Sequence, residues 1–239
     1  MKKVDLKNDP NRVLIIICYI TLIFWLFTIP AYFNLIPLEF ITISHIKLPT
    51  FQMWEFFIVF PFVLMVTYLA FVRKSLLSWS EIGFNKGKKG IFNTISYGLM
   101  GGVIQGVFIH FTTDHSLLKG RIAINFFEKC ISAPIWEEFL FRVLMFSMFE
   151  MFMMLFIKRS KMTPRSEMVT KIIWYFNIVM ILSVIFALMH SGFSRWIFTF
   201  AIMAHLVYYR TRSIVAPAIT HFISNFVSGG FLYLVLSFL

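Results

Sequence analysis

Two adjacent carboxylates and a guanidinium lie in an otherwise apolar stretch, at Glu137, Glu138 and Arg142. On insertion scales, each such group costs about 2.5–3.5 kcal/mol at the centre of a membrane helix, so ionisable residues in these segments mark functional sites. Glu138 and Arg142 are four residues apart, share a helix face and can form an ion pair. Glu137 points about 100° away, so the two carboxylates need not have the same role.

Two later apolar stretches also carry polar side chains at helical spacing. His190 follows Phe186 by four residues, and Asn225 follows His221 by four. At about 1.5 Å per residue, Glu137 lies roughly 10 Å inside the outer edge of its span, and Asn225 reaches a similar depth. His190 lies at the outer end of its own span. The polar groups can therefore converge in one half of the bilayer.

These side chains suit the hydrolysis of an amide. A carboxylate in a pocket with little solvent can act as a general base on water, and a neighbouring histidine can share or orient that water. A second histidine and an asparagine amide can donate hydrogen bonds to a developing oxyanion. Arg142 would hold Glu138 ionised and in place, which leaves Glu137 free to react. No serine or cysteine nucleophile is needed.

Three ordered motifs therefore lie on successive apolar stretches: Glu137-Glu138-x-x-x-Arg142, Phe186-x-x-x-His190 and His221-x-x-x-Asn225. In this order they resemble the motifs of the CPBP family. That family comprises the type II CAAX prenyl endopeptidases and the bacterial ABI proteins of bacteriocin processing and immunity. The resemblance covers roughly residues 130–230, without a departure at the motif positions. The earlier stretch 80–84 (SEIGF) also resembles the family.

The resemblance implies an intramembrane endopeptidase of the CAAX-protease type. It implies that Glu137 is the catalytic base and that His190 helps to activate water. It further implies that His221 and Asn225 form the oxyanion site. The residues with supporting roles would be Glu138 and Arg142.

Metal dependence is an alternative, because the family has also been interpreted as a group of metalloproteases. Glu137, His190 and His221 would then be the zinc ligands. The sequence contains no H-E-x-x-H motif, and the basic Arg142 close to these ligands disfavours a cation. We therefore expect no cofactor, with zinc as the alternative.

Three other functions compete with proteolysis. The polar groups could hold helices together as a packing network. They could form a proton or ion pathway, which would predict broken helices and internal repeats, and no repeat is visible. The chain could also be a catalytically silent family member, acting as an immunity or regulatory scaffold that binds a membrane partner.

The composition predicts an all-α, polytopic membrane protein with a buried polar cavity. Of the 239 residues, 59% are hydrophobic and 14% are charged, whereas soluble domains average about 25% charged. The net charge of +11 could suggest nucleic-acid binding. Lysine and arginine instead form short clusters between apolar runs, which is typical of membrane topology signals. The expected partners are the lipid bilayer and a membrane-associated peptide or protein, with no nucleic acid.

The apolar runs predict about seven transmembrane helices, with six to eight as the range. We expect a cytoplasmic arm at residues 1–12, N-terminal transmembrane helices at 13–129 and a CPBP-like catalytic core at 130–239. The expected spans are 13–33, 53–72, 90–111, 122–157, 172–190, 196–209 and 214–239.

Charge bias predicts the orientation of the chain. Most of the 22 Lys and Arg residues lie in segments 1–12, 73–89, 158–171 and 210–212. Positively charged loops stay in the cytoplasm, so we expect a multi-pass cell-membrane protein with a cytoplasmic N-terminus and a cavity open to the outer face. The Phe-, Ile- and Lys-rich composition is typical of a bacterial homologue. A peptide precursor, such as a bacteriocin or signalling peptide, is then the expected substrate.

Other features lead to packing expectations. Small residues at Gly98, Gly102 and Gly106 predict that another helix approaches this span closely. We expect His205 to be interfacial or solvated. Glu150 is expected to extend to the interface or to pair with a lysine.

Overall fold

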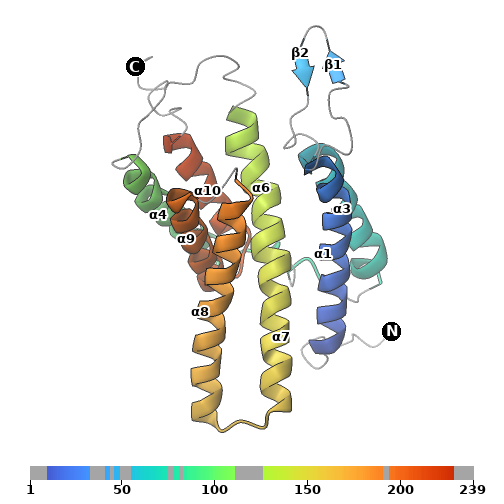
Figure 1. The fold of residues 1–239 in the computed structure, drawn as a ribbon, viewed down its shortest axis with the longest axis vertical. Coiled ribbons are helices and arrows are strands. Elements are labelled where there is room, and N and C mark those ends of the chain that lie inside the picture. Colours follow the sequence, from blue (N-terminus) through green and yellow to red (C-terminus); the bar gives the residue numbers. More distant parts are fainter. Residues whose placement is uncertain are drawn as a thin grey trace.

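The structure is a computed structural model, and it shows a helical bundle with one small β-hairpin (Figure 1). The helical fold class agrees with the prediction from composition. The residues described are 10–32, 41–43, 46–48, 55–74, 78–80, 83–110, 126–190 and 194–228.

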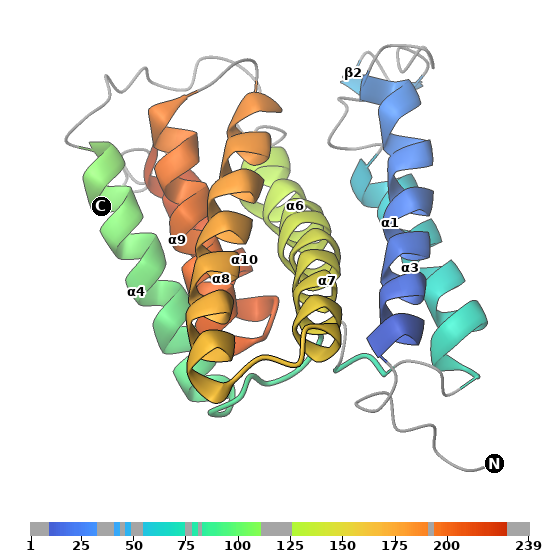
Figure 2. The ribbon, with the colours of Figure 1, turned by 60° about the horizontal axis from the view of Figure 1, so that its bottom comes forward.

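The first helical pair lies along one side of the molecule. It consists of α1 (Pro10–Tyr32) and α3 (Phe60–Thr67), and α3 continues at both ends into π-helical turns, Glu55–Val59 and Tyr68–Val72. Figure 2 shows α1 and α3 side by side, with the other helices grouped opposite them. This pair corresponds to the first two predicted spans.

The hairpin between these helices was not predicted from the sequence, which indicated a loop. Strands β1 (Ile41–Ile43) and β2 (Ile46–Leu48) are antiparallel, with Thr42 opposite Lys47. Alternating β-branched residues favour such short extended segments.

One long helical rod forms the centre of the fold. It runs from the π-helical segment Phe127–Ser132 through α6 (Ala133–Glu138) and a second π-helical segment, Phe139–Met145, into α7 (Phe146–Arg159). The rod corresponds to the long fourth helix expected at 122–157. Its middle section is almost wholly buried, because α1 packs on one side and α8, α9 and α10 on the other. π-Helical turns occur frequently at functional sites, and here they flank the two glutamates.

Helix α8 (Pro164–Leu188) returns antiparallel to α7 and begins eight residues before the expected position. The Thr163 side chain caps it by accepting a hydrogen bond from the Ser166 backbone N–H at 3.3 Å. Glu167 and Lys171 pair at 2.5 Å on its first turns. Local capping and an i,i+4 pair thus extend the helix into a basic segment that hydropathy alone assigns to a loop.

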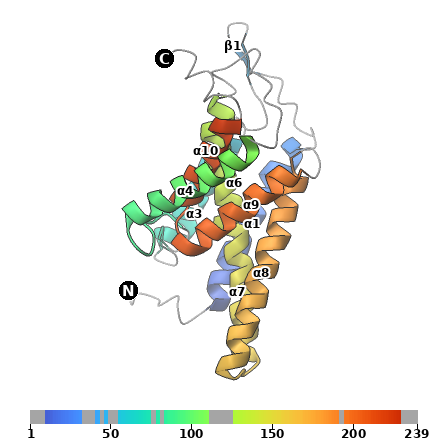
Figure 3. The same cartoon turned by 90° about the vertical axis from the view of Figure 1, so that its left-hand side faces the viewer.

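The last helices complete the bundle around the site. They are α9 (Arg195–Thr211) and α10 (Val215–Ser228), and α10 packs against α4 (Ile91–His110), as Figure 3 shows. The final predicted span extended to residue 239, but residues 229–239 lie outside the part that the structure describes. These helices bring the third motif next to the first.

The predicted close approach at the glycines of α4 is confirmed. A Cβ atom on Gly98 would lie 2.7 Å from the Ala216 carbonyl oxygen, and one on Gly102 would lie 2.7 Å from the Ile223 Cβ. The Thr220 hydroxyl donates a hydrogen bond of 3.1 Å to the Gly98 carbonyl. Only residues without a side chain let α4 and α10 pack at this separation.

Within the described part of the chain, three helical segments are long and apolar enough to cross a membrane, judged by length and composition. These are Ile91–Ile109, Lys129–Arg159 and Pro164–Leu188. Two shorter apolar segments, Leu14–Leu26 and Phe56–Val72, lie in the N-terminal pair. The chain is therefore a helical membrane protein, and the expected number of seven spans stays a prediction.

Candidate active site

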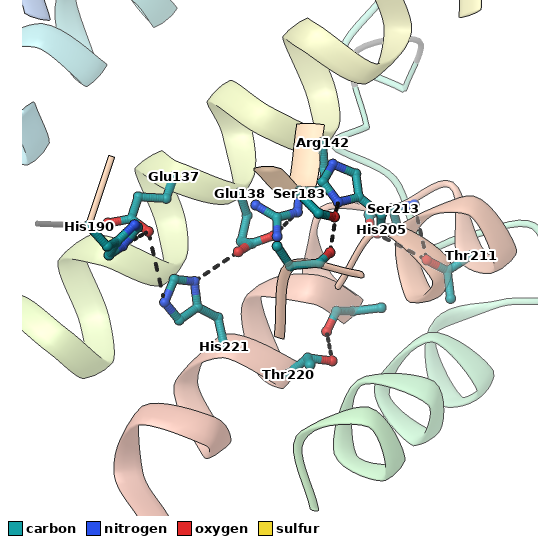
Figure 4. Close-up of polar contacts among 12 residues, drawn as sticks. Glu137, Glu138, Arg142, Ser183, His190, His205, Thr211, Ser213, Thr220 and His221 are labelled. Carbon is teal, nitrogen blue, oxygen red and sulfur yellow. Dashed lines mark hydrogen bonds and ion pairs between the residues drawn. The ribbon is translucent and has the colours of Figure 1, made fainter. Parts of the chain in front are cut away.

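Helix α6 places both glutamates of the first motif inside the bundle. Glu137 is 5% exposed, and Glu138 is fully buried. The two side chains leave the helix in different directions, and Figure 4 shows Glu137 near His190 and Glu138 near Arg142. The angular offset expected from sequence therefore separates the two carboxylates into different surroundings.

Glu138 forms the predicted ion pair with Arg142. The Arg142 Nε lies 2.9 Å from Glu138 Oε2, and both side chains are completely buried. The guanidinium carbon lies 4.6 Å from the centre of the Phe186 ring. A buried charge needs such compensation, which here comes from the carboxylate and from cation–π contact. The pair fixes the orientation of Glu138.

His221 on α10 is held by the same carboxylate. Its Nδ1 lies 2.8 Å from Glu138 Oε1, and its ring packs against Phe200 with centroids 4.5 Å apart. Because a carboxylate accepts hydrogen bonds, Nδ1 carries the proton in this arrangement. The other ring nitrogen, Nε2, then faces Glu137 Oε2 at 4.0 Å.

His190 approaches Glu137 from the end of α8. The Phe186 carbonyl accepts a hydrogen bond of 2.8 Å from His190 Nδ1, which directs Nε2 to Glu137 Oε2 at 3.5 Å. About a third of the His190 side chain is exposed (32%). Phe186 thus has two contacts that explain its place in the second motif: its backbone orients His190, and its ring covers Arg142.

A cavity of about 450 Å³ opens beside these groups. Such a volume lies within the range of small-molecule and peptide side-chain pockets. The sequence did not predict that Lys129 and Ser224 line this cavity. The spacing of Ser224, one helical turn after His221, could have indicated it. Residues that line the cavity include Lys129, Ala133, Glu137, Phe186, His190, Ser194, Trp196, Phe200, His221, Ser224 and Asn225.

Asn225 lines the cavity, but its amide is already engaged. The Asn225 Nδ2 donates a hydrogen bond of 2.6 Å to the backbone carbonyl of Lys129. This bond joins α10 to the start of the central rod. One of the two amide hydrogens remains available for another acceptor.

Five of the polar motif side chains form one connected cluster: Glu137, Glu138, Arg142, His190 and His221. The sixth, Asn225, lines the same cavity. Glu137 stands between two imidazoles, and Glu138 between an imidazole and a guanidinium. The expected convergence of three helices is therefore present in the geometry. What each residue does chemically stays a prediction.

The described residues do not fit a metal ion. Among them, no three His, Cys, Asp or Glu side chains are grouped as the ligands of one metal would be. His221 already uses Nδ1 for Glu138, and the guanidinium of Arg142 supplies positive charge to the same cluster. We derive no chemical step through a metal.

His205 was expected to be interfacial or solvated, and this prediction is wrong. This residue of α9 is fully buried, its Nδ1 donates to the Ala201 carbonyl at 2.7 Å, and its ring stacks on Phe146 with centroids 6.0 Å apart. Hydropathy placed it near the end of a short span. Packing of α9 against α8 and the central rod buries it instead.

Glu150 also has a different partner from the expected lysine. It forms a two-point ion pair with Arg212, in which Arg212 Nη2 lies 2.6 Å from Glu150 Oε1, and the Tyr175 hydroxyl donates to the same oxygen. Burial disfavours the charged form of Arg212, but the hydrogen bonds and charge of Glu150 outweigh burial and raise its pKa. This second cluster joins α7 and α8 to the turn before α10.

One comparison with known proteins covers the region that contains the site. Residues 120–227 match the protein-family model described as type II CAAX prenyl endopeptidase Rce1-like. The match covers 108 of the 239 residues, and this part of the chain is similar to that family. The matched range contains all three motifs. The family model describes endopeptidases, so the match favours a peptide or protein substrate. No curated protein and no solved structure matches the chain.

Proposed function

We propose that this Rce1-like chain is an intramembrane endopeptidase that hydrolyses a peptide bond in a membrane-associated peptide or protein. One observation carries the proposal. The Glu137 carboxylate lies on a cavity wall between two imidazole nitrogens, 3.5 Å from His190 Nε2 and 4.0 Å from His221 Nε2. A carboxylate with two histidines at this spacing suits the activation of one water molecule.

The hydrogen bonds of the histidines support this assignment. Each Nδ1 faces an oxygen acceptor, the Phe186 carbonyl for His190 and the Glu138 carboxylate for His221. Both Nδ1 atoms therefore carry protons, and both Nε2 atoms point toward Glu137. In its neutral form, His190 Nε2 accepts a hydrogen bond from the same water that Glu137 deprotonates.

The chemical steps then follow from these positions. Water held by Glu137 and His190 attacks the carbonyl carbon, and its proton passes to the Glu137 carboxylate. The tetrahedral intermediate carries an oxyanion, which needs hydrogen-bond donors within reach. When the C–N bond breaks, Glu137 returns the proton to the leaving amine. No covalent enzyme intermediate is formed.

His221 serves the oxyanion by donating a hydrogen bond from Nε2, which in this step carries a proton as well as Nδ1. The Glu138 carboxylate on Nδ1 orients the ring, as in hydrolases that use an Asp–His pair. The remaining amide hydrogen of Asn225 is a second donor for the oxyanion.

Arg142 contributes indirectly. It contacts Glu138 rather than the cavity, and it holds that buried carboxylate in place. We therefore assign Glu138 and Arg142 positioning roles.

We further propose the finer properties that the family does not specify. The substrate is a membrane-associated peptide precursor, for which bacteriocin processing or immunity is the bacterial context. The protein is a multi-pass cell-membrane protein with a cytoplasmic N-terminus. The cavity faces the outer side of the membrane. Catalysis needs no cofactor.

The test uses the purified full-length protein in detergent and a fluorogenic farnesylated CAAX peptide as a surrogate for the membrane-associated precursor, chosen because residues 120–227 match the CAAX prenyl endopeptidase model. We expect cleavage by the parent protein and none by Glu137→Ala or His190→Ala. Glu167→Gln is the matched control, because this carboxylate lies on α8 outside the site. Cleavage that persists unchanged in Glu137→Ala contradicts the proposal. A cellular immunity phenotype that survives Glu137→Ala favours the silent scaffold instead.

A further inference from the structure

A second hollow lies between α1, α7 and α8, at the end of the rod remote from the glutamates. It is a groove of about 580 Å³. Arg159, which lines the groove, lies 22 residues after Glu137, or about 33 Å along the helical rod. The groove is therefore separate from the proposed active site, and what binds it does not depend on catalysis.

The walls of this groove are aromatic and aliphatic. Phe152 and Phe156 of α7 are about half exposed, at 45% and 47%, and Ile15 of α1 faces them at 65% exposure. Trp174 of α8 adds a ring 6.0 Å from that of Phe156. Apolar side chains that line a groove within a bilayer are in contact with acyl chains rather than water.

The mouth of the groove is polar and positively charged. Arg159, the last residue of α7, lines it together with Asn11 of α1. Arg159 is exposed, and within the described ranges no carboxylate lies within ion-pair distance of its guanidinium. The turn that follows α7 adds Lys161 and the start of α8 adds Arg165. The groove therefore combines an unneutralised cation with an apolar channel.

We propose that this groove binds one anionic phospholipid from the surrounding bilayer, with its phosphate on Arg159 and an acyl chain along Phe152 and Phe156. Arginine matches phosphate oxygens with two parallel N–H donors. Basic pockets between membrane helices on the cytoplasmic side are sites for anionic headgroups. An indole at this level suits the boundary between headgroups and chains. The lipid bridges α1 to α7 and α8.

The test is native mass spectrometry of the full-length protein in a neutral detergent. Phosphatidylglycerol and phosphatidylcholine with identical acyl chains are added at equal concentration. We expect one phosphatidylglycerol to be retained per chain, in clear preference to phosphatidylcholine. Arg159→Gln should weaken phosphatidylglycerol retention about tenfold, as expected for the loss of a charge-assisted hydrogen bond. Lys158→Gln is the matched control, because it removes the same charge one residue away, outside the groove.

A second variant tests the acyl-chain part of the site. Leu155 lines the groove and is only half-buried, so Leu155→Trp fills the channel without disturbing the packed core. It should reduce retention of both lipids. Equal retention of the two lipids by the parent protein overturns the proposal. So does an equal loss of phosphatidylglycerol in Arg159→Gln and Lys158→Gln, since a diffuse basic surface would then account for binding.

Discussion

His221 Nδ1 lies 2.8 Å from Glu138 Oε1, so a histidine from the last described helix is oriented by a carboxylate from the central rod. The second oxygen of that carboxylate contacts Arg142 at 2.9 Å. Glu138 is therefore the residue through which α10 and the rod are joined at the site. Its neighbour Glu137 instead faces the Nε2 atoms of His190 and His221. The division between a fixed and a reactive carboxylate leads to the first prediction.

Replacing Glu138 by Gln should impair turnover more than substrate binding. The amide keeps the size of the side chain but lacks the charge and the second acceptor oxygen that hold Arg142 and His221 in place. We expect kcat to fall on the order of 10²–10⁴-fold with little change in KM, the range typical of a lost acid–base contribution. Steady-state kinetics on the farnesylated peptide would measure this. A kcat within a factor of two of the parent would show that His221 does not depend on Glu138.

Arg142 should matter for stability as well as activity. Arg142→Gln leaves the fully buried Glu138 without its counterion, which typically costs about 3–5 kcal/mol. We expect a clearly lowered midpoint of thermal unfolding in detergent. The double variant Glu138→Gln/Arg142→Gln should lose less than the two single changes added together, because no uncompensated charge remains. Strict additivity would mean that the two side chains are not coupled.

Replacement of the α4 glycines by alanine should destabilise the protein to different degrees, depending on how closely α10 approaches each position. A Cβ on Gly102 would lie 2.7 Å from Ile223 Cβ, whereas one on Gly106 would lie 3.2 Å from Val227 Cγ2. Gly102→Ala should therefore displace α10, destabilise the protein by about 1–3 kcal/mol and reduce activity, since α10 carries His221. Gly106→Ala is the milder comparison. The prediction fails if Gly106→Ala is the more damaging change in unfolding and peptide cleavage.

Chelators should not inhibit the enzyme. The proposed steps use only Glu137, the two histidines, Asn225 and water. We expect peptide cleavage to survive prolonged incubation with EDTA or 1,10-phenanthroline at constant pH. Loss of activity that added Zn²⁺ restores would instead support Glu137, His190 and His221 as metal ligands.

The orientation of the chain can be tested with single cysteines. In a variant with Cys18 and Cys130 replaced, Lys161→Cys lies in the turn between α7 and α8, and Lys129→Cys lies beside the cavity. Charge bias predicts that an impermeant maleimide added to intact cells labels Lys129→Cys only. Lys161→Cys should react only after the membrane is permeabilised. The reverse pattern would place the cavity on the cytoplasmic side. The loop 112–120, which also bears on this point, lies outside the described residues.

Much of the site followed from local spacing. A separation of four residues on a helix places Glu138 beside Arg142 and lets the Phe186 carbonyl reach His190, whatever the rest of the fold does. The packing role of the α4 glycines followed similarly from small residues at every fourth position. The start of α8 did not, because hydropathy is insensitive to the Thr163 cap and the Glu167–Lys171 pair that extend the helix.

The sequence-based predictions were wrong for residues whose contacts lie far away in the sequence. His205 is buried because α9 is enclosed by neighbouring helices, and Glu150 pairs with Arg212 across 62 positions. Neither contact leaves a periodic signal near the residue. The hydrogen bond of the Asn225 amide was missed for the same reason, since the Lys129 carbonyl that accepts it belongs to another helix.

The sequence by itself determined that the chain is a membrane protein. It also determined which buried polar side chains mark the site and which residues share a helix face. These follow from composition and from the 3.6-residue repeat, which depend only on the chain near each residue. Only the tertiary structure decided that His221 binds Glu138 rather than Glu137, and that Glu137 lies between two Nε2 atoms. Such relationships depend on how helices cross and on their depth relative to one another, which local spacing does not specify.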